Sequence, residues 1–274
     1  MMQRLSRLNY LVLLVSLGIA GCNASSEQAV EVPTAVILPP KSAVEGAGQP
    51  VPDNRTVNEF RVALLGNSHV HVNNLAGQLQ QLLQVGRPQA AVHTYVAGGA
   101  GFLDERLTDS ETESLLVTQS WSHVIVQGQK YSTSGLVTHP TDAAKYWLAL
   151  IKSRQATPIL FPEHARYGNN EEGNRVYMLH RSIAEEEATC VAPVPLAWYA
   201  SLRQQPELRL HMADGNHANL EGTLLSAMIF FEAITGDPAD QLPYVSAIPV
   251  SRANQQHLRQ LASATLQQYP ACPF

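Results

Sequence analysis

Cysteine, basic charge and long apolar runs are all scarce in this sequence of 274 residues, which has three cysteines and a formal net charge of −5. An acidic chain lacks the electrostatic footprint of a nucleic-acid-binding protein, so nucleic acid is excluded as a partner. Apolar residues make up 45% of the chain and charged residues 15%, which is typical of a globular protein rather than a disordered one. The length indicates one domain, or one domain with appendages.

The first 22 residues have the layout of a secretory signal. Arg4 and Arg7 give a basic start, and the apolar run from Tyr10 to Ala20 is too short to span a bilayer. The run leads into Ile-Ala-Gly-Cys22, which resembles a bacterial lipobox. This resemblance implies that Cys22 is diacylated and becomes the mature N-terminus; a plain cleaved signal or a short anchor helix is the alternative.

Residues 23–55 contain five prolines among scattered Gly, Ser and Ala, which is typical of an extended tether. We therefore predict a lipoprotein signal peptide over 1–22, a flexible tether over 23–55 and one globular domain over 56–274. The lipid on Cys22 would hold the exported chain to the membrane, on the periplasmic face of the cell envelope. Asn23 after that cysteine favours the outer membrane over the inner one, by resemblance to enteric lipoproteins.

Two further cysteines, Cys190 and Cys272, remain once Cys22 is set aside, and an even number in an exported chain allows a disulfide. Such a bond would tie the C-terminus to the domain. Two separate buried thiols agree with the sequence equally well, so the sequence leaves this choice open.

From Phe60 onwards, short apolar runs alternate with segments of helical periodicity, which calls for a parallel sheet covered on both faces. We predict a three-layer α/β/α sandwich, flavodoxin-like, with about five strands. Ligands of such folds bind at the carboxyl ends of the strands. The strands are expected at 61–65, 91–96, 123–127, 158–161 and 191–196, and the helices at 73–85, 141–155, 175–188, 220–234 and 252–268.

The first predicted strand runs into Leu-Leu-Gly66-Asn67-Ser68-His69, and a helix follows. A serine at a strand-to-helix turn exposes its hydroxyl near the free amides of the helix N-terminus, which suits a nucleophile that faces a developing oxyanion. The alternative is a serine that only caps the helix.

The segment Asp214-Gly-Asn-His217 opens the strongly apolar helix expected over 220–234. A histidine base needs an acid on its second ring nitrogen, which fixes the tautomer and stabilises the imidazolium. An aspartate three residues before the histidine can supply that acid from the same loop. The alternative is that Asp214 forms an Asx turn or caps the helix and that His217 is merely solvated.

Together, Gly66-Asn-Ser68 near the start of the domain and Asp214-x-x-His217 near its end resemble the SGNH/GDSL hydrolases, over residues 60–235. The resemblance implies that Ser68 is the nucleophile, His217 the general base and acid, and Asp214 its orienting partner. The order Ser, Asp, His also occurs in α/β-hydrolases. However, the turn lacks the second glycine of a nucleophile elbow, and the serine comes too early for that fold.

The middle blocks of this family supply oxyanion donors beside the backbone amide of Ser68. The glycine-rich loop 97–101 corresponds to the second block, with Gly99 as the expected donor and Gly98 as the alternative. A purely structural role, in a turn that needs positive φ, would also explain a glycine here. In the third block the family's Gly-x-Asn-Asp appears as Gln127-Gly-Gln129-Lys130. Gln129 would then replace the asparagine donor, with Gln127 left open as the alternative, and this Gln-x-Gln pattern indicates a divergent branch.

Four other side chains are expected at the substrate: Asn67, which replaces the usual aspartate of the first block, His69, and Glu163 with His164 after the fourth strand. His69 and His71 form a His-x-His pair of the kind that binds Zn²⁺, so a metal-dependent hydrolase is an alternative. No spaced Glu or His pair completes a metal motif, and no cofactor is required by the proposed chemistry.

The sequence thus predicts a serine hydrolase that cleaves carboxylic esters through an acyl-enzyme, with O-acetyl or short acyl groups on glycans as the expected substrates. The substrate class rests on the resemblance alone. The alternative from another class is a non-catalytic, ligand-binding lipoprotein on the same scaffold.

Overall fold

The computed structural model describes residues 44–169 and 171–274. The predicted signal peptide, the lipidation site Cys22 and the tether as far as residue 43 lie outside the described residues. Within the described part, five parallel strands form one sheet in the order β2-β1-β3-β4-β5. Their bounds are β1 Glu59–Leu65, β2 Ala91–Val96, β3 His123–Val126, β4 Thr157–Leu160 and β5 Cys190–Val191.

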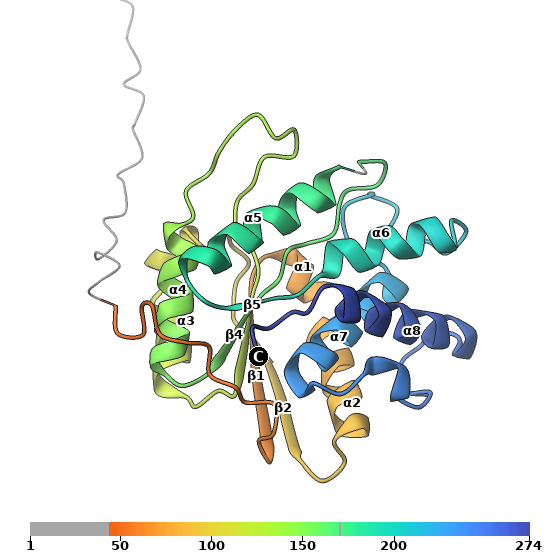
Figure 1. The fold of residues 1–274 in the computed structure, drawn as a ribbon, viewed down its shortest axis with the longest axis horizontal. Coiled ribbons are helices and arrows are strands. Elements are labelled where there is room, and N and C mark those ends of the chain that lie inside the picture. The colour runs from red at the N-terminus through yellow and green to blue at the C-terminus, as the bar shows by residue number, and fades with distance from the viewer. Residues whose placement is uncertain (1–43, 170) are drawn as a thin grey trace, which may run out of the picture. The chain divides into compact units, whose positions relative to one another are not determined.

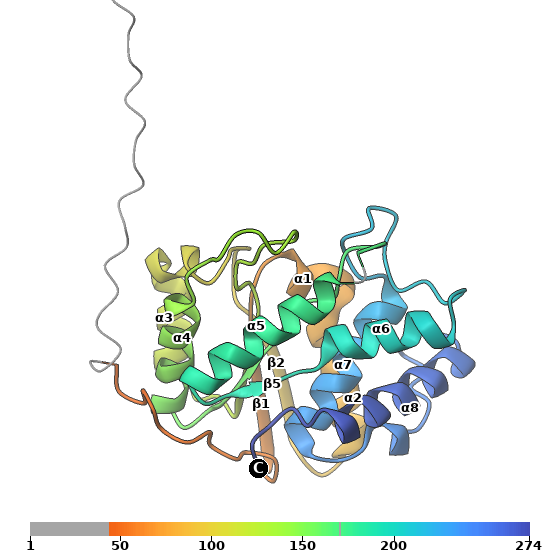
Figure 2. The same ribbon diagram turned by 45° about the horizontal axis from the view of Figure 1, so that its top comes forward.

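The sheet lies between two layers of helices, so the predicted three-layer α/β/α sandwich is confirmed (Figures 1 and 2). One core joins the sheet to α2 (Leu75–Gly86), α6 (Val194–Gln204), α7 (Leu220–Thr235) and α8 (Arg252–Gln268). The other core joins it to α3 (Ser110–Thr118), α4 (Asp142–Ser153) and α5 (Glu172–Glu186). The short helix α1 (Ser68–His71) follows β1.

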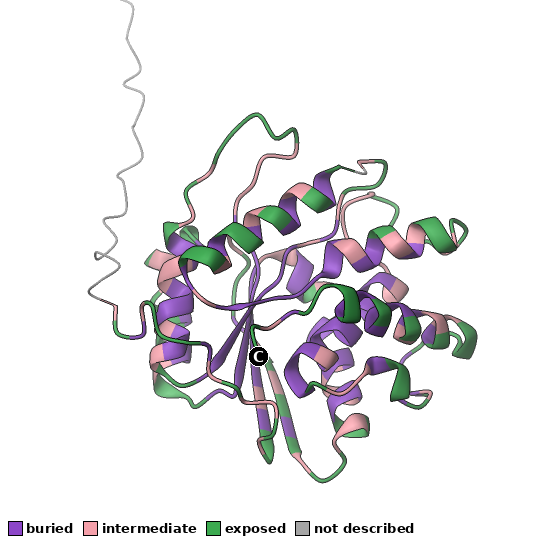
Figure 3. Ribbon diagram, viewed as in Figure 1, coloured by how far each residue is buried: buried purple, intermediate pink, exposed green. Residues whose placement is uncertain are grey.

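Every residue of β3 and β4 is buried, as expected for parallel strands that are covered on both faces (Figure 3). In register, Val62 of β1 lies opposite His123 of β3, and Ile125 of β3 lies opposite Ile159 of β4. The chain goes from β1 to β2 on one side and then crosses to β3 on the other. The order of strands therefore reverses at β1, and the loop after β1 is where this class of fold places its ligand site.

The fifth strand is shorter than predicted. It ends at Val191, and α6 begins at Val194, although residues up to 196 were expected to continue the strand. Pro193 precedes the helix and Pro195 lies in its first turn, where a missing N–H costs no helical hydrogen bond. The two prolines therefore start a helix rather than extend a strand.

The domain begins earlier than predicted, because residues 44–55 pack on it. Lys152 and Glu187, both fully buried, form an ion pair, and the ammonium of Lys152 also donates to the carbonyl of Gln49, at 2.7 Å. The amide of Asn54 donates to the carbonyls of Ser122 and Gln155, at 3.0 and 2.9 Å. A flexible tether that reaches residue 55 does not agree with these contacts.

Cys190 and Cys272 form a disulfide, which settles the choice that the sequence left open. The bond joins β5 to the C-terminal segment, and the N–H of Val191 donates to the carbonyl of Ala271 next to it, at 2.7 Å. The C-terminus is thereby held at the edge of the sheet. No helix among residues 44–169 and 171–274 is long and apolar enough to cross a membrane.

Candidate active site

Ser68 is the first residue of α1, directly after the turn that ends β1. The helix cap is the preceding residue: Oδ1 of Asn67 accepts a hydrogen bond from the N–H of His69, at 3.0 Å. The alternative that Ser68 serves as the cap is therefore wrong. Its hydroxyl is left to bond elsewhere, and it lies 2.8 Å from Nε2 of His217.

Asp214 and His217 lie in the loop between α6 and α7. Oδ1 of Asp214 accepts from the N–H groups of Asn216 and His217, at 2.9 and 3.0 Å, so it closes an Asx turn. Asn219 caps α7 by accepting from the N–H of Gly222, at 3.0 Å. Asp214 thus forms the Asx turn that the alternative interpretation predicted, but its second oxygen faces His217, so that histidine is not merely solvated.

The three side chains form a continuous hydrogen-bonded chain. Oδ2 of Asp214 lies 2.6 Å from Nδ1 of His217, and Nε2 of the same ring lies 2.8 Å from Oγ of Ser68. The bond to His217, aided by the two backbone N–H groups, holds the pKa of the Asp214 carboxyl well below its usual range. An ionised Asp214 keeps the proton on Nδ1, which leaves Nε2 free to accept the proton of the serine.

A cleft of about 530 Å³ opens in front of Ser68. Three of the residues that were expected to contact substrate, Asn67, His69 and Glu163, line it. The other residues that line it include Ala100, Phe102, Lys130, Tyr131, His139 and Arg166. Phe102 and Tyr131 were not singled out from the sequence, although both lie in loops after strands, and that position was the signal that could have found them.

His164 does not line the cleft, so the prediction that it contacts substrate is wrong. Its ring is buried and stacks on Trp198, with centroids 3.6 Å apart. Its Nε2 lies 2.9 Å from the carbonyl of Asn216, the residue before His217. Burial lowers the pKa of His164 well below the usual value, so the ring is neutral at pH 7 and can donate to that carbonyl. His164 supports the His217 loop from behind.

His69 lies between His217 and Glu163. Its ring centroid is 5.1 Å from that of His217, and its Nε2 is 3.8 Å from Oε1 of Glu163. Burial lowers the pKa of His69, and the nearby Glu163 carboxylate only partly offsets that effect. A neutral His69 adds no second positive charge beside a His217 that takes up a proton.

The glycine-rich loop is fixed by a buried arginine, Arg106, which sequence reasoning missed. Its guanidinium is 3% exposed and donates to the carbonyls of Gly98 and Gly99, at 3.2 and 3.3 Å, and to that of Gly66. A trans peptide points its N–H away from its carbonyl, so the N–H groups of Gly99 and Ala100 face away from Arg106. Ala100 lines the cleft, which leaves its N–H as a donor candidate beside that of Gly99.

Neither glutamine of the third block offers a free amide to the cleft. Nε2 of Gln129 donates to the carbonyls of Lys130 and Pro140, at 2.8 and 3.0 Å, so its prediction as an oxyanion donor does not agree with the structure. Gln127 is fully buried: its Oε1 accepts from the N–H of Asn67, at 2.8 Å, and its Nε2 donates to Glu163. Gln127 therefore braces the serine turn against Glu163.

The two histidines of the His-x-His pair do not face one site. His71 is exposed and its Nε2 lies 2.9 Å from the carbonyl of Gly99, whereas His69 is buried beside Glu163. Over residues 44–169 and 171–274, no group of three or more His, Cys, Asp or Glu side chains is arranged to hold a metal ion. The described residues thus supply no ligand set for the metal-dependent alternative.

Comparison with solved structures shows the same fold in other proteins. A candidate SGNH hydrolase from Slackia heliotrinireducens superposes with a TM-score of 0.53 at 21% identity, covering 64% of this chain and 98% of that one. A DUF4886 family protein from Bacteroides uniformis gives 0.59 at 15% identity, covering 78% and 96%. No protein-family model and no curated protein matches the chain. The likeness extends to the fold: an SGNH-hydrolase-type sandwich with a five-stranded parallel sheet.

Proposed function

We propose that this protein is a serine hydrolase of carboxylic esters, with Ser68 as nucleophile, His217 as general base and acid, and Asp214 as the group that orients His217. The observation that carries the proposal is the unbroken chain from Asp214 Oδ2 through the His217 ring to Ser68 Oγ, at 2.6 and 2.8 Å. These residues come from the two ends of the domain and meet at the edge of the cleft.

The proposed reaction has two steps. Ser68 Oγ attacks the ester carbonyl while its proton passes to His217 Nε2, and the carbonyl oxygen becomes an oxyanion. The imidazolium then gives that proton to the leaving alcohol, and the acyl group stays on Ser68 as an ester. A water molecule, deprotonated by the same nitrogen, attacks the acyl-enzyme and releases the acid and the free serine. The chemistry draws on no metal or organic cofactor.

Donors for the oxyanion come from the backbone in this proposal. They are the N–H of Ser68, at the start of α1, and the N–H of Gly99 or Ala100. The latter two N–H groups face away from Arg106, because Arg106 binds the carbonyls of the same peptide groups. Gln127 holds the turn that carries Ser68 by accepting from the N–H of Asn67. Fixed donors need no reorganisation as charge develops, which is the source of their catalytic effect.

Hydrolysis of p-nitrophenyl acetate by the full chain, kept in detergent, tests the proposal. Ser68→Ala is expected to lower kcat by about a thousandfold or more, since a triad without its nucleophile keeps only a small residual rate. Ser114→Ala, an exposed serine on α3, is the matched control. Equal rates for Ser68→Ala and wild type would refute the assigned nucleophile.

The proposal also covers the location of the enzyme in the cell and its substrates. We infer from the sequence that the lipid on Cys22 anchors the chain to the outer membrane on its periplasmic face, and that short acyl esters, including acetyl groups on glycans, are the substrates. Incorporation of labelled palmitate in cells tests the anchor, and Cys22→Ser is expected to abolish it. Labelling that persists in Cys22→Ser would refute the lipidation site.

A further inference from the structure

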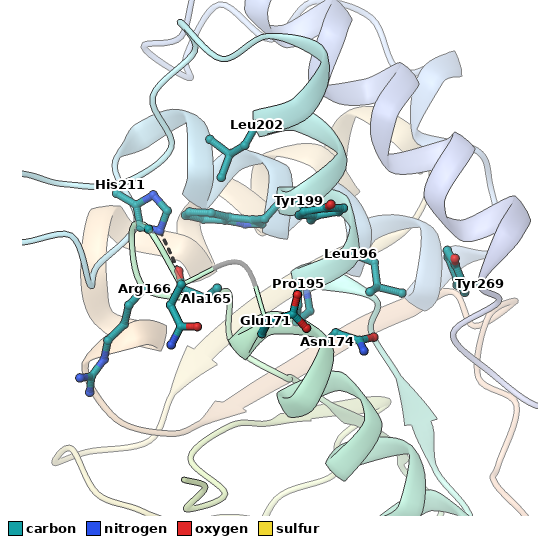
Figure 4. A pocket seen from close by; sticks show the side chains of 14 residues that line it. Ala165, Arg166, Glu171, Asn174, Pro195, Leu196, Tyr199, Leu202, His211 and Tyr269 are labelled. Atoms are coloured by element: carbon teal, nitrogen blue, oxygen red, sulfur yellow. Dashed lines mark hydrogen bonds between the residues drawn. The ribbon is translucent and has the colours of Figure 1, made fainter. Parts of the chain in front are cut away.

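A second cavity, of about 330 Å³, lies beside the catalytic cleft, between the first turn of α5 and helix α6 (Figure 4). Arg166 lines both cavities. The volume of the second cavity is in the range of small-molecule sites, which begins at about 300 Å³. None of the residues of the proposed triad lines it, so the reaction proposed above leaves this cavity unexplained.

The walls of this second cavity differ in chemistry. Three aromatic residues line it: Trp198 and Tyr199 from α6, and Tyr269 after the end of α8. Tyr199 lies on one side of the cavity, and Tyr269 lies at its edge, nearer Leu196 (Figure 4). Glu171 and Asn174 lie on the opposite side, at the start of α5 (Figure 4). Together with Arg166 they supply hydrogen-bond donors and acceptors, with one positive and one negative charge.

Contacts tie the wall of the second cavity to the proposed triad. The N–H of Tyr167 donates to the carbonyl of Gly215, at 2.8 Å, and Nε2 of His211 lies 2.8 Å from the carbonyl of Ala165. The buried carboxylate of Glu172 accepts from the N–H of Arg166, at 2.7 Å, and from the hydroxyl of Tyr131 in the cleft, at 3.1 Å. The second cavity is therefore built onto the same loops that shape the cleft.

We propose that the second cavity is a subsite for an uncharged saccharide unit of the substrate whose ester group lies at Ser68. The proposal deepens the esterase function and rests on it, because the saccharide is part of a substrate only if the ester at Ser68 is cleaved. The apolar C–H face of a sugar ring packs on an aromatic ring, and its hydroxyls both donate and accept. Tyr199, which is 47% exposed, and the polar groups opposite it meet both needs at once.

The polar side of this cavity argues against an acyl chain as occupant. An aliphatic chain would leave Arg166, Glu171 and Asn174 without hydrogen-bond partners wherever it displaced their water, which costs free energy for each group. A strongly charged ligand would meet one favourable and one unfavourable charge. A neutral polyhydroxylated ring is the class of ligand that satisfies every wall.

Calorimetric titration of the full-length Ser68→Ala chain, in a detergent without a sugar headgroup, tests this subsite directly. Cellohexaose, xylohexaose and chitohexaose are the probes. At least one is expected to bind, and the added substitution Tyr199→Ala is expected to weaken that binding by about tenfold or more. Tyr95→Ala, which removes an equally exposed tyrosine (47%) on β2, is the matched control and is expected to leave binding unchanged.

Two results would overturn the subsite: binding of none of the three probes, or binding that Tyr199→Ala leaves intact. The esterase function is tested separately by p-nitrophenyl acetate, which is too small to need the second cavity. A wild-type chain that binds a probe through Tyr199 but cleaves no ester would refute the esterase and leave a saccharide-binding protein.

Discussion

Asp214 and His217 are joined twice, because one carboxylate oxygen accepts from the backbone N–H of His217, at 3.0 Å, and the other lies 2.6 Å from its ring Nδ1. A single aspartate thus fixes both the turn that carries the histidine and the orientation of its ring. The low pKa of Asp214 keeps this carboxylate charged through the acid range in which an ordinary aspartate takes up a proton.

Asp214→Asn is expected to keep the fold and to lower kcat for p-nitrophenyl acetate by about 10⁴-fold, as amide replacement of the triad acid does in serine proteases. The amide can still accept from the two backbone N–H groups, but it does not stabilise a proton on Nδ1 of His217. Steady-state kinetics with circular dichroism as the check on folding measure the effect. Asp240→Asn, at an exposed aspartate in the 3-10 turn Ala239–Gln241, is the control. Activity within tenfold of wild type would remove Asp214 from the triad.

Arg106→Lys is expected to lower kcat by about 10- to 100-fold while KM changes little. A lysine keeps the charge but cannot reach the three carbonyls with the fixed fork of a guanidinium, so the loop of Gly98 and Gly99 loses its fixed orientation. Arg106 acts on the reaction only by positioning, and the separation of kcat from KM distinguishes this role from a loss of folded enzyme.

The control for Arg106 is Arg154→Lys, which changes a surface arginine whose side chain donates to the carbonyl of Val117, at 2.9 Å. Thermal unfolding of both variants shows how much folded protein remains at the assay temperature. A fall in kcat that matches the lost folded fraction would contradict the positioning role.

The two glutamines of the third block are expected to respond differently to substitution. Gln127→Met breaks the brace between the Asn67 N–H and Glu163, so we expect kcat to fall by about tenfold or more. Gln129→Met removes bonds to the carbonyls of Lys130 and Pro140 only, so we expect lower stability with kcat close to wild type. Assays of p-nitrophenyl acetate at saturation compare the two. A larger loss of kcat in Gln129→Met would restore it as the oxyanion donor.

Much of the scaffold could be read from the sequence, because apolar runs and helical periods are local signals. The strands that end before Gly66 and Gln127 are recognisable for this reason, and so is the apolar helix α7. Helix α3 was not predicted: Ser110–Thr118 carries mostly polar residues, and its packing uses only Thr112, Leu115 and Leu116. A helix held by so few apolar side chains gives little periodic signal.

The site was predictable where one residue type has one chemical use, as for Ser68 and His217, whose approach follows from the topology of a parallel sheet. Roles that depend on the direction of a side chain were not. His164 and Gln129 stand at the expected edge of the sheet, yet both turn towards backbone carbonyls and away from the cleft. Arg106 lies in no motif, and only the folded chain brings its guanidinium to the carbonyls of Gly98 and Gly99.

The buried pair of Lys152 and Glu187 leads to a prediction about stability. Lys152→Met leaves the carboxylate of Glu187 buried without its ammonium partner and removes the bond to the carbonyl of Gln49, so we expect the free energy of unfolding to fall by about 3–5 kcal/mol. Lys145→Met is the control, because Lys145 pairs with the exposed Glu186 at 2.8 Å and such surface pairs contribute about 1 kcal/mol or less. Urea denaturation measures both variants. Equal losses in the two variants would mean that this buried charge does not hold residues 44–55 to the domain. As a second readout, we expect proteolysis of that segment to be faster in Lys152→Met than in wild type.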